Sequence, residues 1–122
     1  MRKFTKDHEW VDVQGDEAVI GITDHAQAEL GDIVFVELPA VGDVVEVGQE
    51  ESAVIESVKA AGGITAPVSG EVVAINEALI DEPSKVNTDA EGDGWFFRVK
   101  LADKSQLDDL MDEAAYKAYL GV

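Results

Sequence analysis

Residues 39–47 of the chain read PAVGDVVEV, and residues 67–75 read PVSGEVVAI. The proline, the glycine and two consecutive valines recur with the same spacing, 28 residues further along the chain. Two hairpins that each begin at a glycine often resemble each other in this way. The repeat also fits a quasi-twofold arrangement in which each half supplies an equivalent strand. This second interpretation predicts a mainly β fold, a sandwich-like barrel of two quasi-symmetric halves.

Turn residues at short spacing divide the rest of the chain into further strands. We expect strands over residues 9–13, 17–22, 33–38, 43–47, 52–58, 71–75 and 95–100. The first two flank Gly15, which supplies the backbone freedom of a hairpin turn. Residues 33–38 are nearly all apolar, so this strand is predicted to be buried on both faces.

Three helical pieces are expected between the strands, and one of them is a turn over residues 82–85 with Pro83 in a helix-starting position. A short one covers residues 24–30, with Thr23 or Asp24 as its N-cap and Gly31 as its terminator. A C-terminal helix covers residues 105–120, begins with a Ser105–Asp108 capping box, and docks on the body through one apolar stripe. The stripe consists of Leu107, Leu110, Met111, Ala114 and Ala118.

Composition excludes several classes of function. The 122 residues include no cysteine, 9 basic and 26 acidic residues, which gives a net charge of −17. Thiol catalysis, thiolate metal sites and disulfides are therefore absent, so redox chemistry needs a group attached to the chain. The negative charge disfavours nucleic acid and anionic membranes as partners. We expect a single domain over residues 1–122, with no targeting peptide, in the cytoplasm of a prokaryote.

Lys59 stands out by its position. It is the only basic residue between Asp7 and Ser84, and it lies close to the midpoint between the two repeats. Even scattering of the nine basic residues would place about six in that stretch. Lys59 could simply form a surface ion pair with Glu56, which would contribute about 0–1 kcal/mol to stability.

The surroundings of Lys59 instead favour a covalently attached group. Small residues follow it in the sequence Ala60-Ala61-Gly62-Gly63, which leaves room for the active site of a modifying enzyme. A base or Schiff-base lysine needs a desolvated pocket that lowers its pKa, and an open acidic turn would act in the opposite direction. With His8 and His25 as its only histidines, the chain also shows no nucleophile–base constellation.

Six separated tracts together resemble the glycine cleavage system H-protein family. They are Asp7–Val11, Gly21–Gln27, Leu30–Pro39, Glu56–Ala61, Ala66–Leu79 and Gly94–Trp95. The resemblance covers nearly the whole chain and implies the barrel-sandwich hybrid fold of lipoyl domains, with short helices and a C-terminal helix. It implies a non-catalytic, monomeric carrier with lipoate amide-linked to Lys59.

The same resemblance implies the carrier's partners. Glycine decarboxylase, a pyridoxal phosphate enzyme, would transfer an aminomethyl group to the lipoyl arm and reduce its disulfide. Aminomethyltransferase would pass the methylene to tetrahydrofolate, and dihydrolipoamide dehydrogenase would reoxidise the dithiol. Lipoylating enzymes would load Lys59. Both sulfur atoms belong to the cofactor, which is consistent with a chain that lacks cysteine.

Other residues take roles from the resemblance. Glu56 and Gly70 match positions that help lipoylating enzymes recognise the loop, although Glu56 could be an ordinary exposed carboxylate and Gly70 a turn glycine with positive φ. His8 and Glu9 match the segment that lines the cleft where the loaded arm rests, although His8 could equally serve packing. We expect His25 to be structural and predict no metal site. The family usually places an acidic residue where this chain has Gly63.

Three alternatives remain open at this point. The chain could be a lipoyl or biotinyl domain of another complex, although biotin sites usually flank the lysine with methionines, and here the neighbours are Val58 and Ala60. It could be an H-like protein that relays lipoate to other complexes. It could also be an unmodified acidic adaptor, which the intact mass would distinguish from a carrier.

Overall fold

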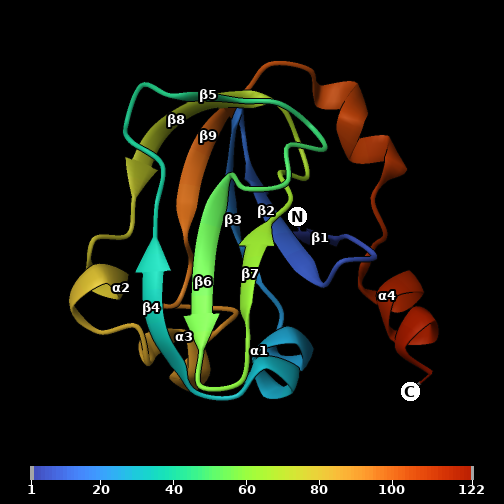
Figure 1. The fold of residues 1–122 in the computed structure, drawn as a ribbon. Coiled ribbons are helices and arrows are strands. Elements are labelled where there is room, and N and C mark those ends of the chain that lie inside the picture. Colours follow the sequence, from blue (N-terminus) through green and yellow to red (C-terminus); the bar gives the residue numbers. More distant parts are fainter. Residues whose placement is uncertain (1, 122) are drawn as a thin grey trace.

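The chain forms two antiparallel β-sheets flanked by short helices (Figure 1), as described by a computed structural model for residues 2–121. The larger sheet has the strand order β1-β2-β3-β9-β8-β5, and the smaller sheet the order β4-β6-β7. The strands are β1 Arg2–Phe4, β2 Glu9–Gln14, β3 Glu17–Ile22, β4 Ile33–Glu37, β5 Val44–Val45, β6 Ala53–Ser57, β7 Ala61–Ile64, β8 Gly70–Ile75 and β9 Phe97–Leu101. The predicted mainly β fold is confirmed.

The helices are all short. They are α1 Asp24–Leu30, α2 Ala78–Asp81, α3 Lys85–Thr88, the 3₁₀ helix η1 Lys104–Asp109 and α4 Glu113–Leu120. None of these helices within residues 2–121 is long and apolar enough to cross a membrane. The single domain predicted over residues 1–122 stays a prediction, and it includes Met1 and Val122, which lie outside the described residues.

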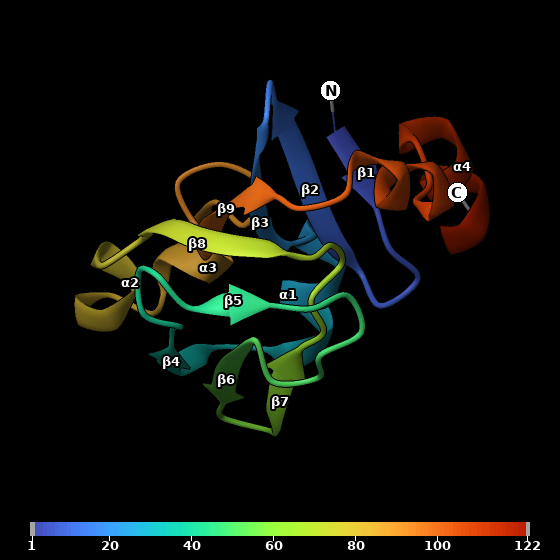
Figure 2. The ribbon, with the colours of Figure 1, turned by 90° about the horizontal axis from the view of Figure 1, so that it is seen from above.

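The two repeats meet in the larger sheet, where β5 pairs antiparallel with β8. Val44 lies opposite Glu71 and Val45 opposite Gly70, and the backbone amide of Val72 donates to the carbonyl of Asp43. Equivalent segments that pair antiparallel are related by a local twofold axis, which is the relation the repeat suggests. Figure 2 shows β5 lying beside β8, with β6 and β7 on the other side of β5.

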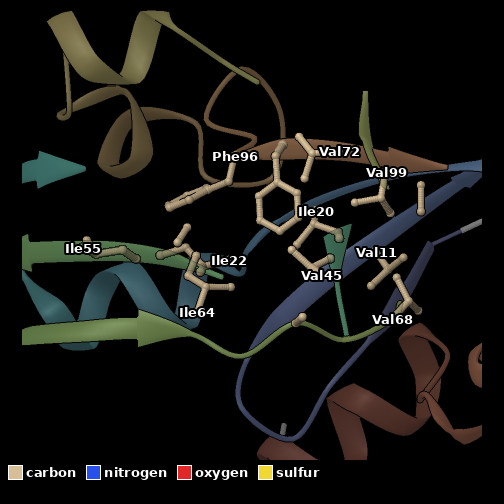
Figure 3. Packing of buried hydrophobic residues seen from close by; sticks show 14 of the residues in the cluster. Val11, Ile20, Ile22, Val45, Ile55, Ile64, Val68, Val72, Phe96 and Val99 are labelled. Carbon is tan, nitrogen blue, oxygen red and sulfur yellow. The ribbon is translucent and has the colours of Figure 1, made fainter. Parts of the chain in front are cut away.

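The main core fills the space between the two sheets (Figure 3). Val11, Ile20 and Val99 of the larger sheet face Ile55 and Ile64 of the smaller sheet, and each of the five side chains is at most 4% exposed. Successive side chains of a strand point to opposite faces. Neighbouring residues of β2 and β3 therefore face away from this core.

A second cluster occupies the outer face of β2 and β3. Its buried members are Phe4, Trp10, Val19 and Tyr116. Phe4 stacks on Tyr116 of α4 at 4.7 Å between ring centroids, and Trp10 donates its indole N–H to the carbonyl of Ala90. The C-terminal helix α4 lies beside β1 at the edge of this sheet (Figure 2). The larger sheet is therefore packed on both faces at β2 and β3.

The C-terminal segment differs from the predicted helix over 105–120. Phe4 and Met111 exchange two backbone hydrogen bonds, which hold Met111 in extended conformation and divide the segment into η1 and α4. Asp103, not Ser105, caps the first piece by accepting from the amide of Ser105, and Asp112 caps α4 through the amide of Ala115. Gly121 ends α4 in left-handed conformation.

The apolar stripe predicted for the C-terminal helix was also wrong in part. Ala114 and Ala118 are exposed, and the buried side chains of the segment are Leu107 and Tyr116. The predicted stripe assumed one continuous helix, but the segment is extended at Met111, in the middle of that stripe. Because α4 begins only at residue 113, a different face of it meets the body.

Strand β4 is not buried on both faces as predicted. Val34 is 55% exposed and Phe35 is 44% exposed, whereas Ile33 and Val36 are buried. β4 is an edge strand of the smaller sheet, and its register with β6 shifts between Ile33 and Phe35. This irregularity turns two consecutive apolar side chains toward solvent. Strands β1 and β7 were not predicted, because β1 has three residues and β7 reads Ala-Gly-Gly-Ile, a loop-like composition.

Gly70 begins β8 between β5 and β9, and it is buried. A β-carbon at this position would collide with the backbone carbonyl of Lys100. Gly70→Ala is therefore expected to lower the free energy of unfolding by about 1–3 kcal/mol, measured by urea denaturation. Gly62→Ala in β7 is the control, since among residues 2–121 no heavy atom other than those of Gly62 and its two chain neighbours lies within 4 Å of the β-carbon position. Equal stabilities of the two variants would contradict this account.

Candidate functional site

Lys59 lies in the turn between β6 and β7, at the end of the smaller sheet and beside α1 (Figure 1). The hydroxyl of Ser57 accepts from the backbone amides of Lys59 and Ala60, at 3.2 and 3.0 Å, and donates to the carbonyl of Ala60. The amide of Ser57 also donates to that carbonyl at 2.7 Å. One serine thus satisfies most backbone groups of the turn, which holds its shape without using the lysine side chain.

The side chain of Lys59 is exposed. Within residues 2–121, no hydrogen bond or ion pair engages its amine. Its stem crosses the end of α1, where a β-carbon on Gly31 would lie 3.1 Å from Cε of Lys59. The amide of Val58 donates to the carbonyl of Asp32 at 3.0 Å. The prediction of an exposed lysine in a hairpin turn agrees with this geometry, and the contact with Gly31 adds a support that the sequence did not indicate.

Asn87 of α3 fixes the segment under Lys59. Its amide nitrogen donates to the carbonyl of Gly31 and to the side chain of Gln27, both at 2.9 Å, and its carbonyl oxygen accepts from the amide of Ile33 at 2.8 Å. One side chain therefore joins the last turn of α1, its terminating glycine and the start of β4. Sequence reasoning missed Asn87, because its partners lie more than fifty residues earlier in the chain.

A cleft of about 380 Å³ lies between α1 and the hairpin that carries Lys59. Its lining includes apolar side chains of Ile22, Leu30 and Ile55, the backbone of Gly62 and Gly63, and polar groups from the segment before β2. A volume of this size accepts a small extended group. The cleft is therefore within the same part of the molecule as the exposed lysine.

Glu9 is the buried polar group of this cleft. It is 4% exposed, and its carboxylate accepts from the hydroxyl of Thr5 and from the amide of Thr65, each at 3.0 Å. Burial raises the pKa of the Glu9 carboxyl from 4.5 to about 7, with a smaller contribution in the same direction from the charge of Asp7. The hydrogen bonds from Thr5 and Thr65 oppose this shift.

His8 sits at the mouth of the cleft in left-handed conformation, with φ of 66°. Its Nδ1 lies 2.8 Å from the hydroxyl oxygen of Tyr116, which in turn lies 2.9 Å from the hydroxyl of Thr23. Thr23 is the predicted N-cap of α1 and accepts from the amide of Ala26. His8 and Glu9, predicted to line one cleft, are both at its wall, and His8 also links α1 to α4.

The remaining predicted residues lie in different places. Glu56 is exposed in β6, opposite Phe35 of β4 and Ala61 of β7, directly before the turn. Gly70 lies far from Lys59, since β8 is at the opposite end of the molecule from the β6–β7 turn (Figure 1). The φ of Gly70 is not positive, so it is not a turn glycine of that kind. Gly63 lines the cleft, and a β-carbon there would meet the carbonyl oxygen of Glu50.

The comparisons with known proteins agree with one another. The family described as "Glycine cleavage H-protein" matches residues 2–121. A glycine cleavage system H protein of Beijerinckia indica is 59% identical over 120 residues, which are 98% of this chain and 96% of that protein. One of Bradyrhizobium diazoefficiens is 57% identical over 116 residues, which are 95% of this chain and 94% of that protein.

The fold is likewise similar to a solved structure. The crystal structure of a glycine cleavage system H protein from Mycobacterium marinum matches with a TM-score of 0.90 and 36% sequence identity. The match covers 99% of this chain and 97% of that chain. Sequence and fold thus point to one family over almost the whole chain.

The raised pKa of Glu9 generates a prediction about stability. Its carboxyl holds a proton up to about pH 7 in the folded protein, but only to about 4.5 in the unfolded chain. Folding therefore loses stability as the pH rises through this interval, by about 3 kcal/mol in total. We expect Glu9→Gln to remove this component, so that the difference in unfolding free energy between wild type and variant changes by that amount between pH 4 and 8. Parallel curves from urea denaturation would contradict the burial of a protonated carboxyl.

Proposed function

This chain belongs to the glycine cleavage H-protein family, the lipoyl carriers of the glycine cleavage system, and we propose that Lys59 is the residue that carries the lipoyl group. The expected family, the carrier function and the covalent lipoate are confirmed by the comparisons. The protein is a carrier and not an enzyme. The match over residues 2–121 also disfavours a lipoyl or biotinyl domain of another complex.

The observation that carries the proposal is the exposed amine of Lys59, which has no hydrogen bond or ion pair with any of residues 2–121, in a turn that other groups hold in place. Lipoate forms an amide with a lysine amine, so the amine must reach the active site of a lipoylating enzyme. Ser57 and the carbonyl of Asp32 hold the backbone, and the amine takes no part in that structure. The residues present therefore fit the group that the family carries.

Bound lipoate supplies a disulfide that accepts the aminomethyl group as it is reduced, and that is restored when the dithiol is oxidised. The chain's own residues shape the place beside it. We assign His8 and Glu9 to the wall of the cleft where the loaded arm rests. Gly63 contributes backbone only, and an acidic side chain there would require the β7 backbone to move away from Glu50.

Recognition by other proteins would use the surface around the turn. The protein is a component of the glycine cleavage system. We propose glycine decarboxylase, aminomethyltransferase, dihydrolipoamide dehydrogenase and lipoylating enzymes as its partners. Glu56 offers an exposed carboxylate beside Phe35, which is 44% exposed, and Val58, which is 66% exposed. These groups supply a mixed acidic and apolar surface at Lys59, whereas Gly70 would influence recognition through the packing of β8.

The relatives named above come from bacteria. A cytoplasmic location and a monomeric state stay predictions from the sequence.

Lys59→Arg tests the attachment site. It keeps the charge and nearly the length of the side chain, but a guanidinium is far less nucleophilic than a free amine and stays protonated. We expect the intact mass to show no lipoyl group after expression with a lipoylating enzyme, and we expect no glycine cleavage with the partner enzymes. The free energy of unfolding should change by less than about 0.5 kcal/mol, because the side chain is exposed.

Lys85→Arg is the matched control, since Lys85 is a lysine of α3 that pairs with Glu82. It should be lipoylated and active like the wild type. A lipoyl group or turnover retained in Lys59→Arg would place the attachment elsewhere.

A further inference from the structure

Three side chains beside the cleft converge although they are distant in sequence. His8 precedes β2, while His25 and Glu29 lie one helical turn apart on α1. Each offers one nitrogen or oxygen atom, and these atoms all lie within 4.8 Å of one another. We propose that His8, His25 and Glu29 form a binding site for a divalent transition-metal ion of the zinc type, with one coordination position left for water or a ligand.

The set of donors suits this class of ion. Two imidazoles and one carboxylate are ligands that Zn²⁺ accepts at about 2.0–2.2 Å, and sites with three protein ligands keep a fourth position open. Two such donors on a tetrahedral ion are about 3.3 Å apart, by geometry from those bond lengths. Nε2 of His25 and Oε1 of Glu29 are 3.1 Å apart. These two atoms already have the spacing of neighbouring ligands.

His8 is held in the way that a ligating histidine usually is. Such a histidine commonly uses its second ring nitrogen in a hydrogen bond to the protein, which fixes the ring. Nδ1 of His8 lies 2.8 Å from the hydroxyl of Tyr116, and Thr23 lies 2.9 Å beyond it. No hydrogen bond to Nε2 of His8 is recorded within residues 2–121, so this nitrogen is the one available to a metal. The rings of His8 and His25 are 4.5 Å apart between centroids.

To reach one ion, the ligand atoms must come closer together, and the side chains that have to rotate are exposed. His25 and Glu29 are 39% and 66% exposed, so small rotations can bring them to one ion. Glu9, although adjacent to His8, is outside the set because Thr5 and Thr65 occupy its carboxylate. His8 and Glu29 also line the cleft. The proposed ion therefore lies at the edge of the cleft, and its binding does not require lipoate on Lys59.

The test uses the full, unlipoylated chain and Zn²⁺ alone, titrated by calorimetry in the presence of excess Ca²⁺. A chain with net charge −17 binds cations diffusely through carboxylates, and Ca²⁺ occupies such sites, whereas imidazole ligands select zinc-like ions. We expect one Zn²⁺ per chain under these conditions. His25→Ala and Glu29→Gln should each weaken binding by roughly tenfold or more.

Two further variants make the test specific. Glu82→Gln removes a carboxylate of similar exposure outside the cluster, 68% against 66% for Glu29, and should leave Zn²⁺ affinity unchanged. His8→Asn keeps a residue that tolerates left-handed backbone, and it should weaken binding while the protein remains folded. With Co²⁺ as a second probe, wild type should show the visible absorption of a four-coordinate ion, and His25→Ala should not. Absence of Zn²⁺ binding in excess Ca²⁺, or binding that is indifferent to His25→Ala and Glu29→Gln, would overturn the proposal.

Discussion

The amine of Lys59 has to remain free while the turn that presents it remains in place, and the rest of the site follows from that constraint. The fixed position comes from groups other than the amine: the side-chain hydroxyl of Ser57 organises the turn, and the backbone carbonyl of Asp32 accepts from the amide of Val58. Asn87 then holds the segment at Gly31 from the other side. Because these contacts use the backbone of Lys59 and not its amine, chemistry at the amine can proceed without disturbing the fold.

The contacts around Lys59 stabilise the fold, whereas the burial of Glu9 lowers the stability of the folded protein near neutral pH. A carboxyl with a pKa of about 7 is partly ionised there inside an apolar wall, and the hydrogen bonds from Thr5 and Thr65 offset part of its desolvation. Such a group is unfavourable as a purely structural element, because an apolar side chain of similar size would pack without this cost. Its place in the cleft beside Lys59 is the reason to assign it to the handling of the carried group.

Local rules in the sequence predicted local features. Thr23 caps α1, Gly15 has the positive φ of its hairpin turn, and the central lysine lies in an exposed turn. The features that the sequence did not predict depend on pairings across the chain. Met111 is extended because Phe4 pairs with it, β4 exposes Val34 and Phe35 because its register shifts against β6, and β7 is a strand because β6 supplies its partner. The sequence also did not predict the hydrogen bonds of Asn87 or the contact between His8 and His25. Both join residues that are distant in the chain, and no residue type or spacing indicates them.

Tyr116 shows how this tertiary pairing reaches the site. In a single helix over 105–120, other residues would pack on the sheets. Because the segment is extended at Met111, α4 instead buries Tyr116 against Phe4, and the Tyr116 hydroxyl lies beside His8 and Thr23. His8 holds a left-handed conformation that costs about 1–3 kcal/mol for a residue with a side chain. The bond to Tyr116 and the packing of α4 offset that cost. The orientation of the cleft wall therefore depends on α4, which lies outside the turn bearing Lys59. His8 adds a side-chain contact to the Phe4–Met111 and Phe4–Tyr116 contacts that already join the two ends of the chain.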